Sequence, residues 1–201
     1  MKNEEKQFGS GWRRQLLAHA HGEVLELFVG EGSNFKYYPA GVHVTATDIS
    51  ARIIEIAKRE AAAHGVYARF IVSAFEDLKL TPQSFDTVVN TFSLNACAEP
   101  LKVLNRINDL CKPGGDILLL ENGLSSCSLI RWLQTRGNHY YYSRTGGRLD
   151  HDIKAILETS MVRVKTVERK LGGMIWLVWG TPGFADSVES MLTPGSGSEA
   201  A

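Results

Sequence analysis

One stretch near the N-terminus constrains the fold of this chain more than any other. Residues 24–34 read Val-Leu-Glu-Leu-Phe-Val-Gly-Glu-Gly-Ser-Asn, an apolar strand that runs directly into a Gly-x-Gly turn. Glycines at the end of a buried strand let a ligand approach bare backbone. If a helix begins near Asn34, its free N–H groups face the same place. The stretch therefore predicts a nucleotide-type pocket.

Two acids, one inside this strand and one at the end of the next strand, suggest what the pocket binds. Glu26 lies inside the apolar strand, where an unpaired carboxylate is costly to bury, so we expect it to face a polar ligand. Asp48 ends a second strand, residues 42–48, where an acid can accept hydrogen bonds from both hydroxyls of a ribose. Phe35 stands where a dinucleotide fingerprint has its third glycine. A nucleotide oxidoreductase is therefore disfavoured but stays an alternative.

The rest of the chain alternates strand and helix patterns. Further strands are expected at residues 70–72, 85–90 and 116–121, with helices at residues 12–20, 51–64 and 100–111. This alternation predicts an α/β fold with a mostly parallel, twisted sheet and helices on both faces. Beyond residue 121 we expect a helix at 125–136, a loop or lid at 137–148, a helix at 150–160, and two strands at 162–170 and 174–180.

Composition and length indicate a single domain. The 201 residues are 44% apolar, enough for one core, and we expect the domain to cover residues 1–180. Residues 181–201 become rich in Gly, Ser and Ala, which predicts a mobile tail.

Five motifs in order along the chain resemble one family, the class I S-adenosylmethionine (SAM)-dependent methyltransferases, and within it the branch of quinone-biosynthesis C-methyltransferases. These motifs lie at residues 26–32, 47–50, 73–78, 84–94 and 110–115. The resemblance implies a Rossmann-like sheet with a C-terminal antiparallel hairpin, SAM as cofactor, and S-adenosylhomocysteine as product. It also implies cofactor contacts from Glu26, Phe28, Gly30, Gly32, Asn34, Asp48, Ile49, Ala74, Phe75 and Asn90.

The sequence departs from the family pattern at two positions. Phe28 occupies the place of the first motif's first glycine, and Ala74 stands where many relatives carry an acid that binds the adenine amino group. Because strand residues surround Phe28, we expect its ring to turn away from the pocket into the packing of the sheet. We also expect Asp48 to hold the ribose and Glu26 to contact the amino end of the methionine portion.

The expected reaction is transfer of the methyl group to a small or lipid-like acceptor. Methyl transfer depends mainly on in-line approach and exclusion of water, so it requires no triad and no metal. An acceptor that must lose a proton still needs a base, and the candidates are His139, Tyr141 and His151. A methyltransferase-like scaffold, with cofactor binding weakened by the changes at Phe28 and Ala74, is the alternative function.

An arginine-rich segment points to a second partner. Residues 123–149 contain Arg131, Arg136, Arg144 and Arg148, together with a tryptophan and three tyrosines, and no acidic residue. Arginines among aromatics favour an anionic partner, which can be a phosphate-bearing molecule, a phospholipid surface or a small anionic substrate. The alternative is a solvated helix face followed by a tyrosine-packed loop.

Charge and cysteine content bound the remaining possibilities. Lys and Arg number 22, as do Asp and Glu, which argues against a surface devoted to a polyanion. No apolar run reaches the length of a membrane span, and residues 1–6 are too charged and short for a signal peptide. Cys97, Cys111 and Cys127 are widely spaced, which predicts buried thiols rather than a metal site. We therefore expect an intracellular, reducing compartment, cytoplasmic by default, with the mitochondrion as an alternative.

Overall fold

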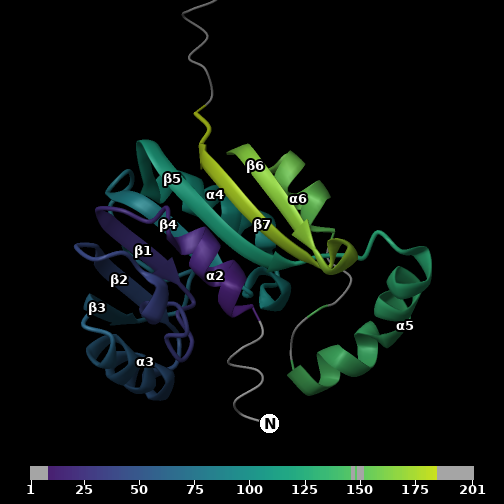
Figure 1. The fold of residues 1–201 in the computed structure, drawn as a ribbon, viewed down its shortest axis with the longest axis horizontal. Coiled ribbons are helices and arrows are strands. Elements are labelled where there is room, and N and C mark those ends of the chain that lie inside the picture. The colour runs from purple at the N-terminus through teal and green to yellow at the C-terminus, as the bar shows by residue number, and fades with distance from the viewer. Residues whose placement is uncertain (1–8, 146–147, 149–151, 185–201) are drawn as a thin grey trace, which may run out of the picture.

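The fold is built on a seven-stranded sheet with the strand order β3-β2-β1-β4-β5-β7-β6 (Figure 1). A computed structural model describes residues 9–145, 148 and 152–184. The strands are β1 Glu23–Leu27, β2 His43–Asp48, β3 Tyr67–Val72, β4 Phe85–Thr91, β5 Cys111–Asn122, β6 Val162–Lys170 and β7 Ile175–Pro182. Strands β1 to β5 pair in parallel, whereas β7 is antiparallel to both β5 and β6. The mostly parallel sheet with a C-terminal antiparallel hairpin is therefore confirmed.

Helices cover both faces of this sheet, as expected. They are α2 Ser10–Leu17, α3 Ala51–Ala63, α4 Pro100–Leu110, α5 Ser128–Thr145 and α6 Ile153–Thr159, with short 3-10 helices η1 Phe35–Tyr37, η2 Leu94–Ala96 and η3 Leu171–Gly173. Buried side chains of α2 and α3 form one core cluster, here called the α2–α3 cluster. Those of α4 and α6 form another, the α4–α6 cluster.

The two clusters divide the residues of each central strand between them. In β1, Val24 belongs to the α2–α3 cluster and Leu25 to the α4–α6 cluster. In β4, Val88 packs in the α4–α6 cluster and Val89 in the other. This is the two-residue alternation of a strand buried on both faces. The position of a polar residue along β1 or β4 therefore decides which face of the sheet its side chain meets.

The structure corrects three expectations about local structure. A helix does begin after Asn34, but it is only the three-residue 3-10 helix η1. Helix α5 continues to Thr145, so the loop expected from residue 137 is helical. The expected tail begins too early, because β7 reaches Pro182 and the Thr181 hydroxyl donates to the Gly115 carbonyl at 2.8 Å. Residues 185–201 of that tail lie outside the described residues.

The cysteines and helices bear on two other expectations. Cys111 is buried and Cys97 half-buried, but Cys127 is exposed, so the expectation of three buried thiols is wrong for that residue. In the described part of the chain, no helix combines the length and apolar character needed to cross a bilayer.

The glycine turn is tightly packed, and this predicts a sharp sensitivity to substitution. Gly32 has a φ of +81°, and a Cβ added there would lie 2.6 Å from Cδ2 of the buried Phe35 ring. Gly41 has a φ of +86° but nothing within 4 Å of its Cβ position. We expect Gly41→Ala to cost roughly 1–2 kcal/mol of unfolding free energy through backbone strain alone.

Gly32→Ala should cost about 1–3 kcal/mol more than Gly41→Ala, because overpacking adds to the same strain. Urea unfolding of the two variants measures the difference directly. Equal losses would show that the Phe35 ring moves aside freely.

Candidate functional site

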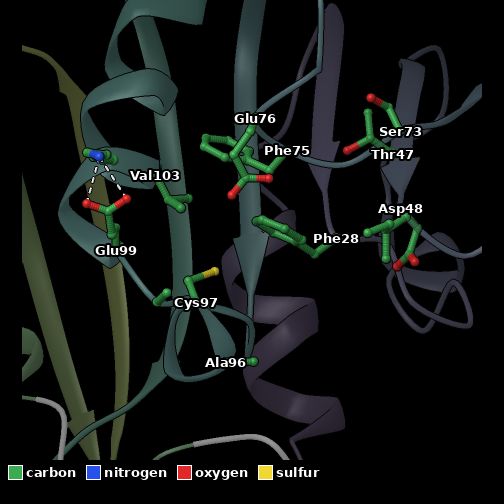
Figure 2. Close-up of a pocket in the computed structure, with 13 residues that line it drawn as sticks. Phe28, Thr47, Asp48, Ser73, Phe75, Glu76, Ala96, Cys97, Glu99 and Val103 are labelled. Atoms are coloured by element: carbon green, nitrogen blue, oxygen red, sulfur yellow. Dashed lines mark hydrogen bonds and ion pairs between the residues drawn. The ribbon is translucent and has the colours of Figure 1, made fainter.

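A cavity of about 300 Å³ opens at the carboxyl ends of β1 and β2 (Figure 2). Its lining comes from these strand ends, from the segment after β3, and from the segment that joins β4 to α4. The lining residues are Phe28, Thr47, Asp48, Ile49, Ser73, Phe75, Glu76, Ala96, Cys97, Ala98, Glu99, Lys102 and Val103. Ligands of open α/β sheets bind at this edge, where the strands end.

Asp48 links the second strand to the glycine turn. Its Oδ2 accepts a hydrogen bond from the Gly30 N–H at 3.2 Å, and its Oδ1 accepts one from the Ser50 N–H at 2.9 Å. Asp48 also lines the cavity, and its two side-chain oxygens can accept further hydrogen bonds. Ile49 follows at the rim with 71% of its surface exposed, which leaves an apolar side chain open to a ligand.

Phe28 lines the cavity, so the expectation that its ring would turn away into the sheet is wrong. The ring stacks on Phe75 with centroids 5.7 Å apart and an interplanar angle of 29° (Figure 2). Phe28 has a φ of +52°, the left-handed conformation that favours glycine. Leu27 packs in the α4–α6 cluster, so strand alternation would place Phe28 on the opposite face of the sheet. Phe28 instead packs on the same α4–α6 cluster. The backbone therefore breaks the strand alternation on which the expectation depended.

A matching break occurs at the end of the neighbouring strand. Phe92 follows β4 with a φ of +53°, and it packs on the α2–α3 cluster although alternation from Val88 would place it on the other face. Side chains other than glycine adopt this conformation at a cost of about 1–3 kcal/mol. Both strained residues lie at carboxyl ends of adjacent parallel strands, beside the cavity edge.

Glu26 is buried on the α2–α3 face and is satisfied by protein groups. Its Oε1 accepts a hydrogen bond from the Asn34 amide and its Oε2 one from the Tyr38 hydroxyl, each at 2.7 Å. Arg13 of α2 donates to the side chains of Asn34 and Thr91. Burial raises the pKa of Glu26 to about 7, opposed by these two hydrogen bonds and the positive charge of Arg13. Glu26 and Asn34 thus form a buried network outside the cavity lining.

A second buried acid, Glu121, lies at the end of β5 and was not identified from the sequence. Its Oε1 accepts hydrogen bonds from the Asn90 amide at 3.0 Å and the Ser93 N–H at 3.3 Å. Its Oε2 is buried and has no hydrogen-bond partner among the described residues. Burial raises the pKa of Glu121 to about 8. The sequence carried the same signal as at Glu26, an acid within an apolar strand, and this signal could have found it.

The other predicted contacts are distributed around the site. Phe75 lines the cavity, Asn90 is bound to Glu121, Gly32 packs beneath Phe35, and Ala74 is absent from the lining. His139 and Tyr141 belong to α5, but their side chains are not described, and His151 lies outside the described residues. The candidate bases therefore stay predictions.

Sequence reasoning missed the wall formed after β4. Residues 96–99 with Lys102 and Val103 close this side of the cavity, and Glu99 pairs with Lys102 at 2.7 Å (Figure 2). This wall could have been predicted from the sheet topology. The segment that follows a parallel strand starts at the carboxyl edge of the sheet, where ligands bind.

Comparison with known proteins is consistent with this fold and site. Residues 25–119 match the model of a family described as "Methyltransferase domain". The chain is similar to methyltransferase OMS1, mitochondrial, of Saccharomyces cerevisiae, with 28% identity over 87% of this chain and 41% of that protein. It is also similar to human thiol S-methyltransferase TMT1B, with 36% identity over 53% of this chain and 46% of that protein. The chain therefore spans less than half the length of these relatives.

A solved structure agrees in fold. Geranyl diphosphate C-methyltransferase of Streptomyces coelicolor, solved with Mg²⁺, geranyl diphosphate and S-adenosylhomocysteine, has a TM-score of 0.70. The two chains share 11% identity over 88% of this chain and 80% of that one, so this likeness concerns the fold. The five motifs, the strand order and the family match over residues 25–119 all support the resemblance to the class I SAM-dependent methyltransferases.

Glu121 generates a prediction about stability and pH. Its folded pKa is about 8, above its ordinary value of 4.5, so between these pH values the folded protein holds a proton that the unfolded chain has released. Stability contributed by this group is therefore present below about pH 4.5 and is lost as the pH rises through about 8. Glu121→Gln should remove this loss, stabilising the protein by roughly 1–3 kcal/mol above pH 8 and little near pH 5.

Thermal melting of wild type and variant at both pH values measures the effect. Glu55→Gln, which replaces an exposed acid paired with Lys58, is the control and should leave the alkaline trend unchanged. A Glu121→Gln effect of the same size at both pH values would refute the assigned protonation.

Proposed function

We propose that this chain binds SAM in the cavity and transfers its methyl group to a small or lipid-like acceptor. The observation that supports this most directly is the carboxylate of Asp48, which ends β2, is bound to the Gly30 backbone and faces the cavity. Asp48 would hold the ribose hydroxyls, and Ile49 and Phe75 would pack beside the adenine. Glu26 lies outside the cavity lining with both oxygens bound, so it would act on the amino end of the methionine portion only through Asn34 and Tyr38.

The cavity fits such a cofactor in chemistry and only narrowly in size. It combines the Asp48 carboxylate with apolar side chains and with further polar ones such as Glu76 and Ser73, but its volume of about 300 Å³ lies at the lower end for small-molecule sites. The Phe28 ring takes up space where the family motif has a glycine. SAM, when bound, supplies a methyl group on a positively charged sulfur. A nucleophile can form a bond to the methyl carbon while the sulfur leaves with the bonding electrons. The chain's part is to hold the two reactants in line and, with the Phe28, Phe75 and Val103 side chains, to exclude water.

A thiol is the first acceptor class to test. Thiols have a pKa near 8.5, so a useful fraction ionises at neutral pH without help from a protein base. Among the described residues, no histidine or tyrosine lines the cavity, and a thiol acceptor suits such a site. The similarity to a human thiol S-methyltransferase supports the same choice. Transfer from labelled SAM to a panel of small thiols, with a quinol for comparison, tests the acceptor class.

A second candidate function follows from Phe28. If its ring blocks the methionine end, the domain is a methyltransferase-like scaffold with weakened cofactor binding. The Phe28 ring lines the cavity and stacks on Phe75, and this position supports the scaffold as the second candidate.

Partner and compartment complete the proposal. An anionic partner would meet the arginine-rich segment that carries Arg131, Arg136, Arg144 and Arg148. An intracellular, reducing compartment suits the free thiols, and the mitochondrial name of the yeast relative supports the mitochondrion.

Asp48 provides the direct test of cofactor binding. Asp48→Ala should weaken SAM binding by about 1.5–3 kcal/mol, the range for hydrogen bonds to a charged group. Asp48→Asn retains one acceptor oxygen and should lose less. Calorimetric titration with SAM measures both variants, and melting curves check that the loss of the Gly30 contact has not unfolded the turn. Unchanged affinity in Asp48→Ala would remove the ribose assignment.

Phe28 separates the enzyme from the scaffold. Phe28→Gly removes a ring from the cavity and relieves a left-handed φ, so we expect SAM to bind up to about tenfold tighter, or 1.4 kcal/mol. The stability lost should be below the roughly 3–5 kcal/mol of a fully buried phenylalanine, because the ring is only partly buried and strain is relieved.

Phe92→Gly is a matched control for this variant. It relieves the same backbone conformation beside the neighbouring strand, but its ring packs on the opposite face and does not line the cavity. Its SAM affinity should therefore equal that of wild type. Binding by Phe28→Gly alone, with none in wild type, would favour the scaffold. Weaker binding by Phe28→Gly would show instead that the ring is part of the cofactor site.

A further inference from the structure

Helix α5 is attached to the protein by polar groups. Arg131 donates from Nε to the Ser125 carbonyl at 2.9 Å. The Gln134 amide donates to the Gly123 carbonyl at 3.2 Å, and its oxygen accepts from the Ser125 N–H at 2.8 Å. Arg131 and Gln134 are three residues apart, so they share one face of the helix. The side of α5 that meets the protein is consequently its polar side.

The opposite side of α5 is exposed and carries several apolar side chains, with Arg136 among them. Leu129, Trp132, Leu133 and Tyr140 expose 65%, 52%, 55% and 66% of their surfaces. Leu129, Leu133 and Tyr140 follow one line along the helix, four and seven residues apart, and Trp132 flanks them. A surface helix of a globular protein normally has the reverse arrangement, with its apolar face inward. Helix α5 also projects from the sheet, beyond the ends of β6 and β7 (Figure 1).

The charge of this segment has one sign. Residues 123–149 carry four arginines and no acid. The Arg136 guanidinium lies 5.1 Å from the Trp132 ring centroid, and position 136 falls on the same line of the helix as Leu133 and Tyr140, so a cation stands among these apolar side chains. Tryptophan and tyrosine beside basic side chains are typical of surfaces that rest at the boundary between lipid headgroups and acyl chains.

A basic hollow of about 210 Å³ lies at the base of α5. Arg131, Lys154 and Arg169 line it, and its one acid, Asp152, accepts hydrogen bonds from backbone N–H groups at the start of α6. The hollow shares Lys154, Arg169 and Trp176 with a groove of about 410 Å³ whose other walls include Leu157, Val162, Val164 and Val167. Glu158 also lines this groove and pairs with Lys154 at 3.5 Å. A cationic hollow next to an apolar groove matches a phosphate headgroup joined to an acyl chain.

We propose that the outer face of α5, together with this hollow, docks the protein on an anionic lipid bilayer. Leu129, Trp132, Leu133 and Tyr140 enter the boundary between headgroups and acyl chains, and the hollow receives a lipid phosphate. The proposal rests on the anionic partner proposed above and identifies it as a membrane surface. It does not depend on methyl transfer, so SAM binding and vesicle binding succeed or fail separately.

Co-sedimentation with vesicles tests the docking surface. We expect the protein to bind phosphatidylcholine vesicles that contain phosphatidylserine at least about tenfold more tightly than vesicles of phosphatidylcholine alone, and added salt should weaken the binding. The double variant Leu129→Ser/Leu133→Ser should lose about tenfold in affinity. Lys154→Gln/Arg169→Gln should lower binding to anionic vesicles and leave the weak binding to neutral vesicles unchanged.

Tyr67→Ser/Val72→Ser is the matched control for the leucine variant. It removes exposed apolar side chains from β3, the strand at the opposite edge of the sheet, and should bind vesicles as wild type does. A blue shift of tryptophan fluorescence on vesicle addition, absent in Trp132→Phe, would support insertion of the α5 face. Melting curves and SAM titrations on each variant separate lost docking from lost folding.

Three results would overturn the proposal. The first is equal binding to neutral and anionic vesicles, and the second is unchanged binding by a folded Leu129→Ser/Leu133→Ser variant. The third is displacement of bound protein from anionic vesicles by a short single-stranded oligonucleotide at low concentration, since this would identify the basic surface as a nucleic-acid site.

Discussion

Burial of the Glu26 carboxylate is the constraint around which the site edge of this protein is arranged. An acid in the central strand is costly to bury without partners. The segment after β1 supplies Asn34 and Tyr38, which donate hydrogen bonds to Glu26, and helix α2 supplies the positive charge of Arg13. Strand β4 supplies Thr91, which accepts hydrogen bonds from both Arg13 and Asn34. Compensation of a single charge thus positions the first helix over the strand ends.

Strain accompanies this arrangement at the same edge. Phe28 and Phe92 hold left-handed backbone conformations where β1 and β4 end, and each conformation transfers a ring to the face opposite the one that strand alternation predicts. The surrounding core must stabilise both, since each costs about 1–3 kcal/mol. At Phe28 the backbone holds a conformation that favours glycine, while the side chain occupies part of the cavity wall.

The sequence was sufficient to predict the sheet, the order of its strands and helices, and Asp48 at the cavity, because these depend on apolar periodicity and on glycine turns. It did not predict the direction of the Phe28 ring, which depends on a backbone angle that strand patterns do not report. It also ended α5 too early: glycine at position 137 and the polar and aromatic residues after it lack the amphipathic period of a core-facing helix.

The reversed polarity of α5 also connects the surface to the cavity. Exposed leucines and a tryptophan are unfavourable in water, so the apolar face of α5 is explained best by a partner that covers it. The segment after α5 returns to the cavity wall, where the Arg148 N–H donates to the Asn95 carbonyl at 2.8 Å within η2. The next residue after Asn95, Ala96, lines the cavity. Docking of α5 on a bilayer would suit an acceptor that partitions into lipid.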